Sequence, residues 1–270
     1  MSEPRTAETV LRDLASGLDP DGEPRIRSVT GGIELLLVTS ERRDGTTGAG
    51  VALNPGGPLP DVTGESTAAV ARRGATADDL ATRAVGIAAL NALSRFEPAD
   101  RSADPFELLD PAVDRIAMIG LFAPVVPRMG DVEVDVIERD PDSMTVPAET
   151  PEHVTVDLHP PEAAESVIPE AGVVYVTGST FVYGGLQRYL DATDADQSVV
   201  VLGATTSFDP TPLFEAGVPV VGGAAVEDLD GVRDGIAEDE QESGLHDRGL
   251  RKLLAVDPSV DRHPGLRLET

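Results

Sequence analysis

At 270 residues, the chain is long for one ordinary domain and sufficient for two. Apolar residues make up 40% of it but aromatic residues only 3%, so Ala, Val, Leu and Ile must fill the cores. The 48 acidic and 21 basic residues give a formal net charge of -27, with no basic stripe for nucleic-acid phosphates. Cysteine is absent, which excludes disulfides, thiolate nucleophiles and cysteine-based zinc sites.

The acidity is typical of a folded protein adapted to concentrated salt. Val-rich runs argue against a disordered acidic chain, and the acids are spread along the chain rather than gathered into one acidic binding surface. Screening by salt reduces the self-repulsion of such a surface. Lys252 is the only lysine, and the composition resembles that of haloarchaeal cytosolic proteins. Residues 1–12 are too polar for a signal peptide, and no apolar run could span a membrane, so we expect a cytoplasmic protein without membrane contact.

The first part of the chain has the pattern of a small α+β domain, predicted over residues 1–96. Residues 6–16 have the spacing of an amphipathic helix that Gly17 ends. Three strand-like runs follow, with a hairpin turn at Gly31-Gly32 between the first two. The runs cover residues 25–29, 33–39 and 48–53.

A loop and a long helix complete this domain. The Asn-Pro-Gly-Gly-Pro run at residues 54–58 can only be loop. Thr76 is predicted to cap a helix that runs to Ser94, with Asp78 and Asp79 in its first turn, where the helix dipole favours anions.

The second part alternates strands with helices. A linker rich in Pro and Asp is predicted at residues 97–112, and a C-terminal tail at residues 257–270. Between them, residues 113–256 predict a Rossmann-like parallel sheet with helices on both faces. Strands are expected at residues 115–119, 132–137, 173–177, 198–202 and 218–221, and helices at 181–190 and 211–216.

Glycines follow four of these strands, at Gly120, Gly178, Gly203 and Gly222. All four fall on the carboxyl edge of the predicted sheet, where open α/β sheets bind ligands. One such glycine would mean little, because many turns require glycine. Four in register predict a small-ligand site at this edge.

Glu138 occupies a position of special interest. It ends the second strand, 18 residues after Gly120, where dinucleotide-binding folds place the acid that accepts ribose hydroxyls. The phosphate loop itself does not match, because Gly-x-Gly-x-x-Gly is missing and Phe122 and Pro124 would crowd a pyrophosphate. NAD is therefore not expected. The alternative is an ordinary strand-end acid facing solvent.

Two hydroxyl-rich loops follow neighbouring strands. Thr177, Ser179 and Thr180 run from a strand into a helix, where hydroxyls and backbone N–H groups favour an anion, although an ordinary helix cap explains them equally well. Residues 203–206 repeat the arrangement. Of the four histidines only His246 lies in a loop typical of function, and the alternative for it is an ordinary surface histidine. His263 falls in a tail expected to fray.

Several strings together resemble a domain-of-unknown-function family associated with heavy-metal chelation. They stand at residues 86–94, 117–126, 136–141 and 174–180, and the resemblance covers residues 5–256. It implies an enolase-N-terminal-like domain before an atypical Rossmann-like domain, with the site in the cleft between them. The resemblance, together with the strand-end pattern, nominates as ligand-binding residues Asn54, Asn91, Gly120, Phe122, Pro124, Glu138, Thr177, Gly178, Ser179, Thr180, Gly203, Thr205 and Thr206, and as metal ligands Glu138 and His246.

The chain departs from the family pattern at two loops. Tyr183-Gly184-Gly185 stands where the family carries an Asn-Gly-Thr-like string, and Gly203-Ala204-Thr205-Thr206 replaces a Gly-Pro-Ser-x-Pro-like loop. These changes remove a side-chain amide and a proline from the expected pocket, which puts the identity of the ligand in doubt but not the fold.

Two functions stay open at this point. The first is a protein that binds a divalent metal or a metal chelate; because carboxylates suit hard cations, a small molecule holding the metal is favoured over a bare protein site. The alternative is a transferase-like enzyme that uses a nucleoside-containing cofactor such as S-adenosylmethionine, with Glu138 on the ribose. The sequence leaves the metal, the reaction and the oligomeric state open, a homo-oligomer included.

Overall fold

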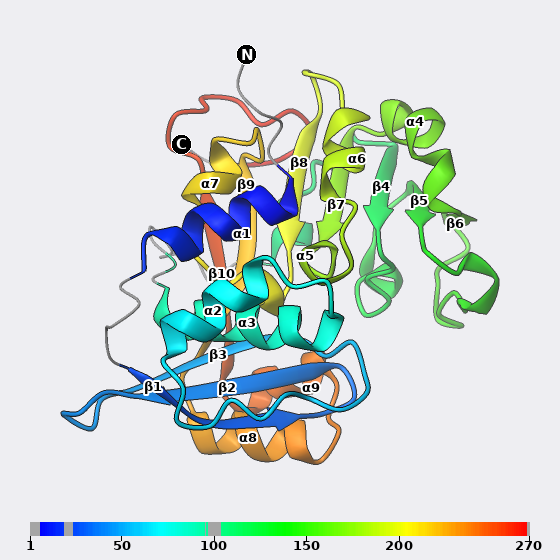
Figure 1. Ribbon diagram of the computed structural model, residues 1–270. Coiled ribbons are helices and arrows are strands. Elements are labelled where there is room, and N and C mark those ends of the chain that lie inside the picture. Colours follow the sequence, from blue (N-terminus) through cyan, green and yellow to red (C-terminus); the bar gives the residue numbers. More distant parts are fainter. Residues whose placement is uncertain (1–5, 19–23, 95, 97–103, 269–270) are drawn as a thin grey trace.

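Two β-sheets organise the protein (Figure 1). The structure is a computed structural model and describes residues 6–18, 24–94, 96 and 104–268. One sheet has three antiparallel strands, and the other has seven strands that are parallel except at one edge. This is the mixed α/β fold that the sequence predicts. Within the described residues, no helix has the length and apolar content needed to cross a membrane.

The first helix forms as predicted. Helix α1 spans Ala7–Ser16, and the Thr6 hydroxyl accepts a hydrogen bond from the backbone N–H of Thr9. Its buried side chains, Val10 and Leu11 among them, join the core that covers one face of the seven-stranded sheet. Figure 1 shows α1 crossing that face beside α7 (Thr211–Phe214).

The three-stranded sheet is covered on both faces. Its strands are β1 (Arg25–Gly31), β2 (Leu35–Glu41) and β3 (Thr47–Leu53), in that order. In the central strand β2, Leu36 and Val38 face the core built by α1, α2 (Thr67–Ala75) and α3 (Leu80–Leu93). Leu35 and Leu37 face α8 (Leu229–Ala237) and α9 (Glu242–Leu245). Burial on two sides explains why residues 35–38 of β2 form an unbroken apolar run.

The prediction of a long helix from Thr76 to Ser94 is wrong at its start. The structure has two helices here, α2 (Thr67–Ala75) and α3 (Leu80–Leu93), and Thr76 ends the first of them. Asp79 caps α3, since its carboxylate accepts the backbone N–H of Thr82 at 2.8 Å. The small residues of α2 hid its apolar periodicity.

Four strands of the large sheet match the predicted bounds to the residue. The sheet runs in the order β10-β9-β8-β7-β4-β5-β6. Strands β6 and β10 were not predicted, and β9 continues past residue 221 instead of ending there. The strands are β4 (Arg115–Ile119), β5 (Val132–Ile137), β6 (Val154–His159), β7 (Val173–Thr177), β8 (Ser198–Leu202), β9 (Val220–Val226) and β10 (Leu250–Val256).

Short helices connect the parallel strands. The helix predicted over residues 181–190 is divided by Gly184 and Gly185, which both have positive φ angles, +83° and +98°. The pieces are α5 (Thr180–Tyr183) and α6 (Leu186–Asp191), and α4 (Ala164–Val167) precedes β7.

The two faces of the large sheet are covered differently. Helices α1, α4, α6 and α7 pack on one face. The other is covered by the 3-10 turns η1 (Pro105–Leu108) and η2 (Val126–Arg128) and by the C-terminal residues. Other 3-10 turns are η3 (Pro141–Ser143), η4 (Pro161–Ala163), η5 (Ile168–Glu170), η6 (Ala204–Thr206) and η7 (His246–Arg248).

The C-terminal residues are packed rather than frayed. Backbone hydrogen bonds join Arg267 to Leu108 and Gly265 to Asp110, and His263 is buried, contrary to the prediction for this histidine. Residues 97–103 of the predicted linker lie outside the described residues. The predicted domain boundaries stay predictions.

Candidate functional site

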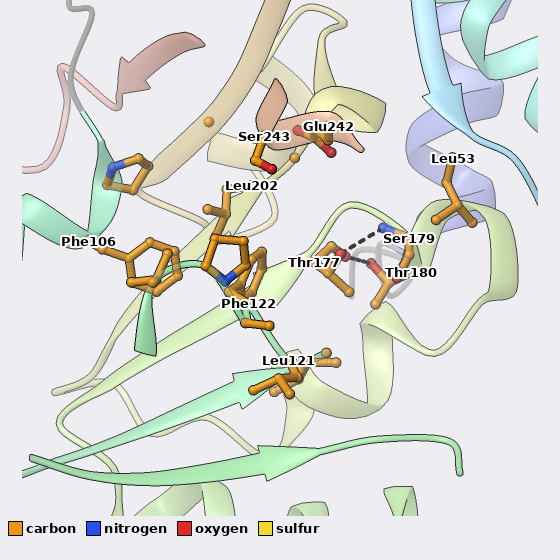
Figure 2. A pocket seen from close by; sticks show the side chains of 18 of the residues that line it. Leu53, Phe106, Leu121, Phe122, Thr177, Ser179, Thr180, Leu202, Glu242 and Ser243 are labelled. Carbon is orange, nitrogen blue, oxygen red and sulfur yellow. Dashed lines mark hydrogen bonds between the residues drawn. The ribbon is translucent and has the colours of Figure 1, made fainter. Parts of the chain in front are cut away.

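A cavity of about 780 Å³ opens at the carboxyl edge of the parallel strands. Figure 2 shows Phe106 and Phe122 on one side of it and Ser179 and Thr180 on the other. Most of the predicted site residues meet here, as the strand-end pattern indicates. Those that line the cavity are Gly120, Phe122, Pro124, Glu138, Thr177, Ser179, Thr180, Gly203 and His246.

The loop after β4 is held by Glu138. Gly120 has a φ of +88°, and a Cβ at this position would come 2.7 Å from the Thr177 side chain, so only glycine fits. The next backbone N–H, that of Leu121, donates a hydrogen bond of 2.8 Å to Glu138 Oε1. Glu138 therefore orders the loop and lines the cavity at the same time.

The hydroxyl groups after β7 are largely engaged within their own loop. Thr177 Oγ1 accepts the Ser179 backbone N–H at 3.3 Å, and the Thr180 hydroxyl donates to the Thr177 carbonyl at 2.9 Å. Helix α5 is a single turn, and the Ser179 side chain does not cap it. The loop therefore forms one wall of the cavity, while most of its polar groups are satisfied internally.

Four predicted site residues lie behind the cavity wall and join the layers. The Asn91 amide donates to the carbonyls of Val51 and Thr205 at 2.7 and 3.0 Å, and Thr205 Oγ1 accepts the Leu53 N–H at 2.9 Å. The Val51 carbonyl and the Leu53 N–H are two residues apart, so both lie on the edge of β3 away from β2. Thr206 donates to the Gly222 carbonyl, and Gly178 lies against the side chains of residues 205 and 206.

The remaining predicted residue, Asn54, closes the first hairpin. Its side-chain amide donates to the Gly32 carbonyl at 2.6 Å, and its oxygen accepts the Gly56 N–H at 3.1 Å. It does not line the cavity.

Aromatic side chains form the apolar wall. The Phe106 ring stacks on the Tyr175 ring at 4.3 Å and meets the Phe122 ring edge-on at 5.2 Å. The Arg139 guanidinium lies 3.5 Å from the centre of the Tyr183 ring. Flat apolar surface and a planar cation thus stand beside Glu138.

A group of charged residues at the cavity escaped the sequence analysis. Lys252 Nζ lies 2.8 Å from Asp104 Oδ2, and Arg128 Nη2 lies 3.6 Å from the same oxygen. Burial raises the pKa of the Asp104 carboxyl, but the hydrogen bonds from Lys252 and the Phe106 N–H and the two cations outweigh it, so the pKa is lowered. The fact that Lys252 is the only lysine of the chain is the sequence feature that could have pointed to this group.

Two acids from distant segments also meet in the cavity wall. Glu34 Oε2 accepts the Glu242 backbone N–H at 2.8 Å, and Glu242 Oε1 accepts the Ala204 N–H at 3.2 Å. The Glu242 residue is half-buried, but its carboxyl lies deep enough that burial raises its pKa, although His246 opposes the shift. Figure 2 shows Glu242 beside Ser243 at the cavity.

The backbone orients the His246 ring. Its Nδ1 lies 2.6 Å from the Leu250 carbonyl, which can only accept, so Nδ1 carries a proton and donates this hydrogen bond. The described part of the chain nevertheless contains no group of three or more His, Asp or Glu side chains that could hold a metal ion. His246 and Glu138 both line the cavity, and their role as metal ligands stays a prediction.

Comparison with known proteins places this fold. A family model described as "Putative heavy-metal chelation" (DUF364) matches residues 104–255. The crystal structure of a DUF364 protein of unknown function from Pyrococcus horikoshii has 21% sequence identity and a TM-score of 0.69, and the match covers 93% of this chain and 98% of that one. The crystal structure of a second DUF364 protein of unknown function, from Desulfitobacterium hafniense, has 19% sequence identity and a TM-score of 0.69, and the match covers 92% of this chain and 98% of that one. No curated protein matches. The family model spans more than half of the sequence, so the chain belongs to the DUF364 family.

Proposed function

We propose that the protein binds a small metal chelate, with the organic part of the chelate seated in the cavity. The observation that carries the proposal is the cavity of about 780 Å³, a size suited to a small organic molecule, with aromatic rings and side chains of both charges in its walls. The description of the family supports a metal as cargo.

The donor set argues for a chelate over a bare heavy-metal ion. Soft metals prefer thiolates, and the chain has no cysteine. Glu138 already accepts a backbone N–H, and the described residues offer no three-ligand cluster. A metal that arrives within an organic ligand needs few donors from the protein, and His246 Nε2 and a Glu138 oxygen can contact it singly.

One observation favours a nucleoside ligand as the second candidate. Glu138 directly follows β5 beside the Gly120 loop, the place of the acid that accepts ribose hydroxyls in dinucleotide-binding folds. An enzyme using S-adenosylmethionine would place its ribose there. This candidate and the chelate compete for the same cavity, so one experiment separates them.

The experiment is a thermal-shift panel in concentrated salt, followed by equilibrium dialysis of every compound that raises the melting temperature. The panel contains ferric citrate, nickel nitrilotriacetate, the free metal ions, S-adenosylmethionine and NAD. We expect the chelates to raise the melting temperature and the free ions to have no effect beyond that of added salt. A response to S-adenosylmethionine alone would favour the enzyme, and a flat response to all compounds would refute both.

Two variants sharpen the result. Glu138→Ala removes the carboxylate at the cavity, just after β5. Glu133→Ala removes one near the other end of β5, where Glu133 is exposed and pairs with Arg115. We expect only the first to weaken chelate binding, by about tenfold. Equal effects would mean that the overall charge matters and the cavity does not.

We also propose that the chain comes from a salt-adapted, haloarchaeal-type organism. The net charge of -27 and the single lysine support this assignment.

A further inference from the structure

The only lysine of the chain lies in the candidate site. Lys252 belongs to β10 and lines the cavity, whereas all other basic residues are arginine. A merely solvated cation could be an arginine here as elsewhere in the chain. The lysine ammonium differs in being a compact charge on a flexible stem, able to approach a small anion closely.

Two cations converge on one buried carboxylate. Lys252 Nζ and Arg128 Nη2 lie 2.8 and 3.6 Å from Asp104 Oδ2. The Asp104 side chain is 9% exposed, whereas those of Lys252 and Arg128 are 41% and 59% exposed. All three line the cavity, so the cations keep free surface there while the carboxylate fixes their position.

We infer that Lys252 and Arg128 form the subsite for an anionic group of the ligand, a carboxylate of a polycarboxylate chelator, with Asp104 as the positioning residue. The inference rests on the proposed function, because it names the ligand chemistry of the same cavity. The three charges sum to one net positive charge in a protein that carries -27 in total. Most of the surface therefore repels a polyanion, whereas at this subsite two cations outnumber the carboxylate between them. The acids Glu34, Glu138 and Glu242 also line the cavity, and Glu242 interacts electrostatically with Lys252.

The single lysine permits a direct test on the unaltered protein. An amine-selective acetylating reagent can modify only Lys252 and the α-amino group of the chain, which serves as the internal reference. Equilibrium dialysis first gives the Kd for citrate and for ferric citrate. At a concentration about ten times that Kd, each should slow acetylation of Lys252 about tenfold and leave the α-amino group unchanged. Trimethyl citrate, which is neutral, should protect neither amine, and inorganic phosphate tests whether any small anion suffices.

Matched variants then measure the contribution of the lysine. Lys252→Met and Arg251→Met remove the same charge from adjacent positions of β10, but the Arg251 side chain pairs with exposed Glu227 and does not line the cavity. We expect Lys252→Met to weaken ferric citrate binding about tenfold, Lys252→Arg to restore part of it and Arg251→Met to have little effect.

The outcomes separate the two proposals. If a chelate binds but Lys252 is acetylated at the same rate and the two Met variants are equal, the anion subsite is wrong and the binding function stands. Protection by phosphate as strong as by citrate would overturn the assignment to a polycarboxylate. If neither citrate nor any chelate binds, the proposed function fails and the subsite fails with it.

Discussion

Replacing Asn91 with alanine should destabilise the protein without weakening ligand binding. The substitution removes both side-chain hydrogen bonds that join α3 to β3 and to η6. Each hydrogen bond contributes about 1 kcal/mol net, and the carbonyls of Val51 and Thr205, left buried without this donor, add a comparable cost. The free energy of unfolding should therefore fall by about 2–4 kcal/mol. For a chain of this size, that corresponds to a melting temperature lower by about 5–15 °C.

Chemical unfolding in concentrated salt measures the loss, and Asn54→Ala is the control. Asn54 also makes two hydrogen bonds, but in the incompletely buried loop after β3, so its loss should cost less. A double-mutant cycle with Thr205→Val, which removes the acceptor for the Leu53 N–H, should show coupling because both residues cover the same edge of β3. The structural role would be refuted if Asn91→Ala kept its stability but lost affinity for the chelate.

Three further predictions concern packing, pH and salt. Gly86→Ala should destabilise the protein by about 1–3 kcal/mol, because the new Cβ would lie 2.4 Å from Gly74 Cα where α2 crosses α3. The control is Gly130→Ala, which has open space around it and should leave the free energy of unfolding unchanged in the same denaturation assay. Glu242→Gln should be more stable than the wild type at neutral pH and equal to it in acid. Because the pKa of the Glu242 carboxyl is raised in the folded state, its contribution to stability is present below the unfolded-state pKa and is lost as pH rises through the folded-state pKa. A difference in melting temperature that stayed constant with pH would contradict the assignment. The melting temperature should rise steeply with KCl concentration, because the charge of -27 repels itself at low salt, and a melting temperature indifferent to KCl would exclude this account.

The strands that the sequence predicts well are those buried on both faces. β7 and β8 are apolar for almost their whole length, because no polar alternation is needed there, whereas β4 begins with Arg115 and β5 carries Glu133 and Asp135. The edge strands β6 and β10 are partly exposed and carry charged residues, so their runs are broken. Periodicity alone does not separate such segments from loops.

The prediction for β9 failed for a different reason. Gly222 and Gly223 were interpreted as a turn that ends the strand, but both lie inside it. A Cβ at Gly223 would come 2.9 Å from the Phe96 ring and 3.1 Å from the Thr206 carbonyl oxygen. The glycine is there for close packing between layers, and sequence alone does not distinguish that use from a turn.

The candidate site was predicted where it depends on the carboxyl edge of the sheet and missed where it depends on long-range contacts. Glu138 and the loops after β4 and β7 follow from the strand pattern. Lys252 lies on an edge strand that was not predicted, and Glu34 reaches the cavity from the three-stranded sheet. Asn91 and Thr205 were predicted to bind the ligand, but their side chains form hydrogen bonds with the backbone of β3 behind the cavity wall.

The placement of the tyrosines gives the protein an intrinsic optical reporter. The chain has three tyrosines and no tryptophan, so tyrosine dominates its ultraviolet emission. Tyr183 and Tyr189 line the cavity, and Tyr175 stacks on Phe106, which also lines it. A bound paramagnetic or strongly absorbing complex would lie close to every emitter at once, so occupancy can be followed by quenching of the native fluorescence, without a label.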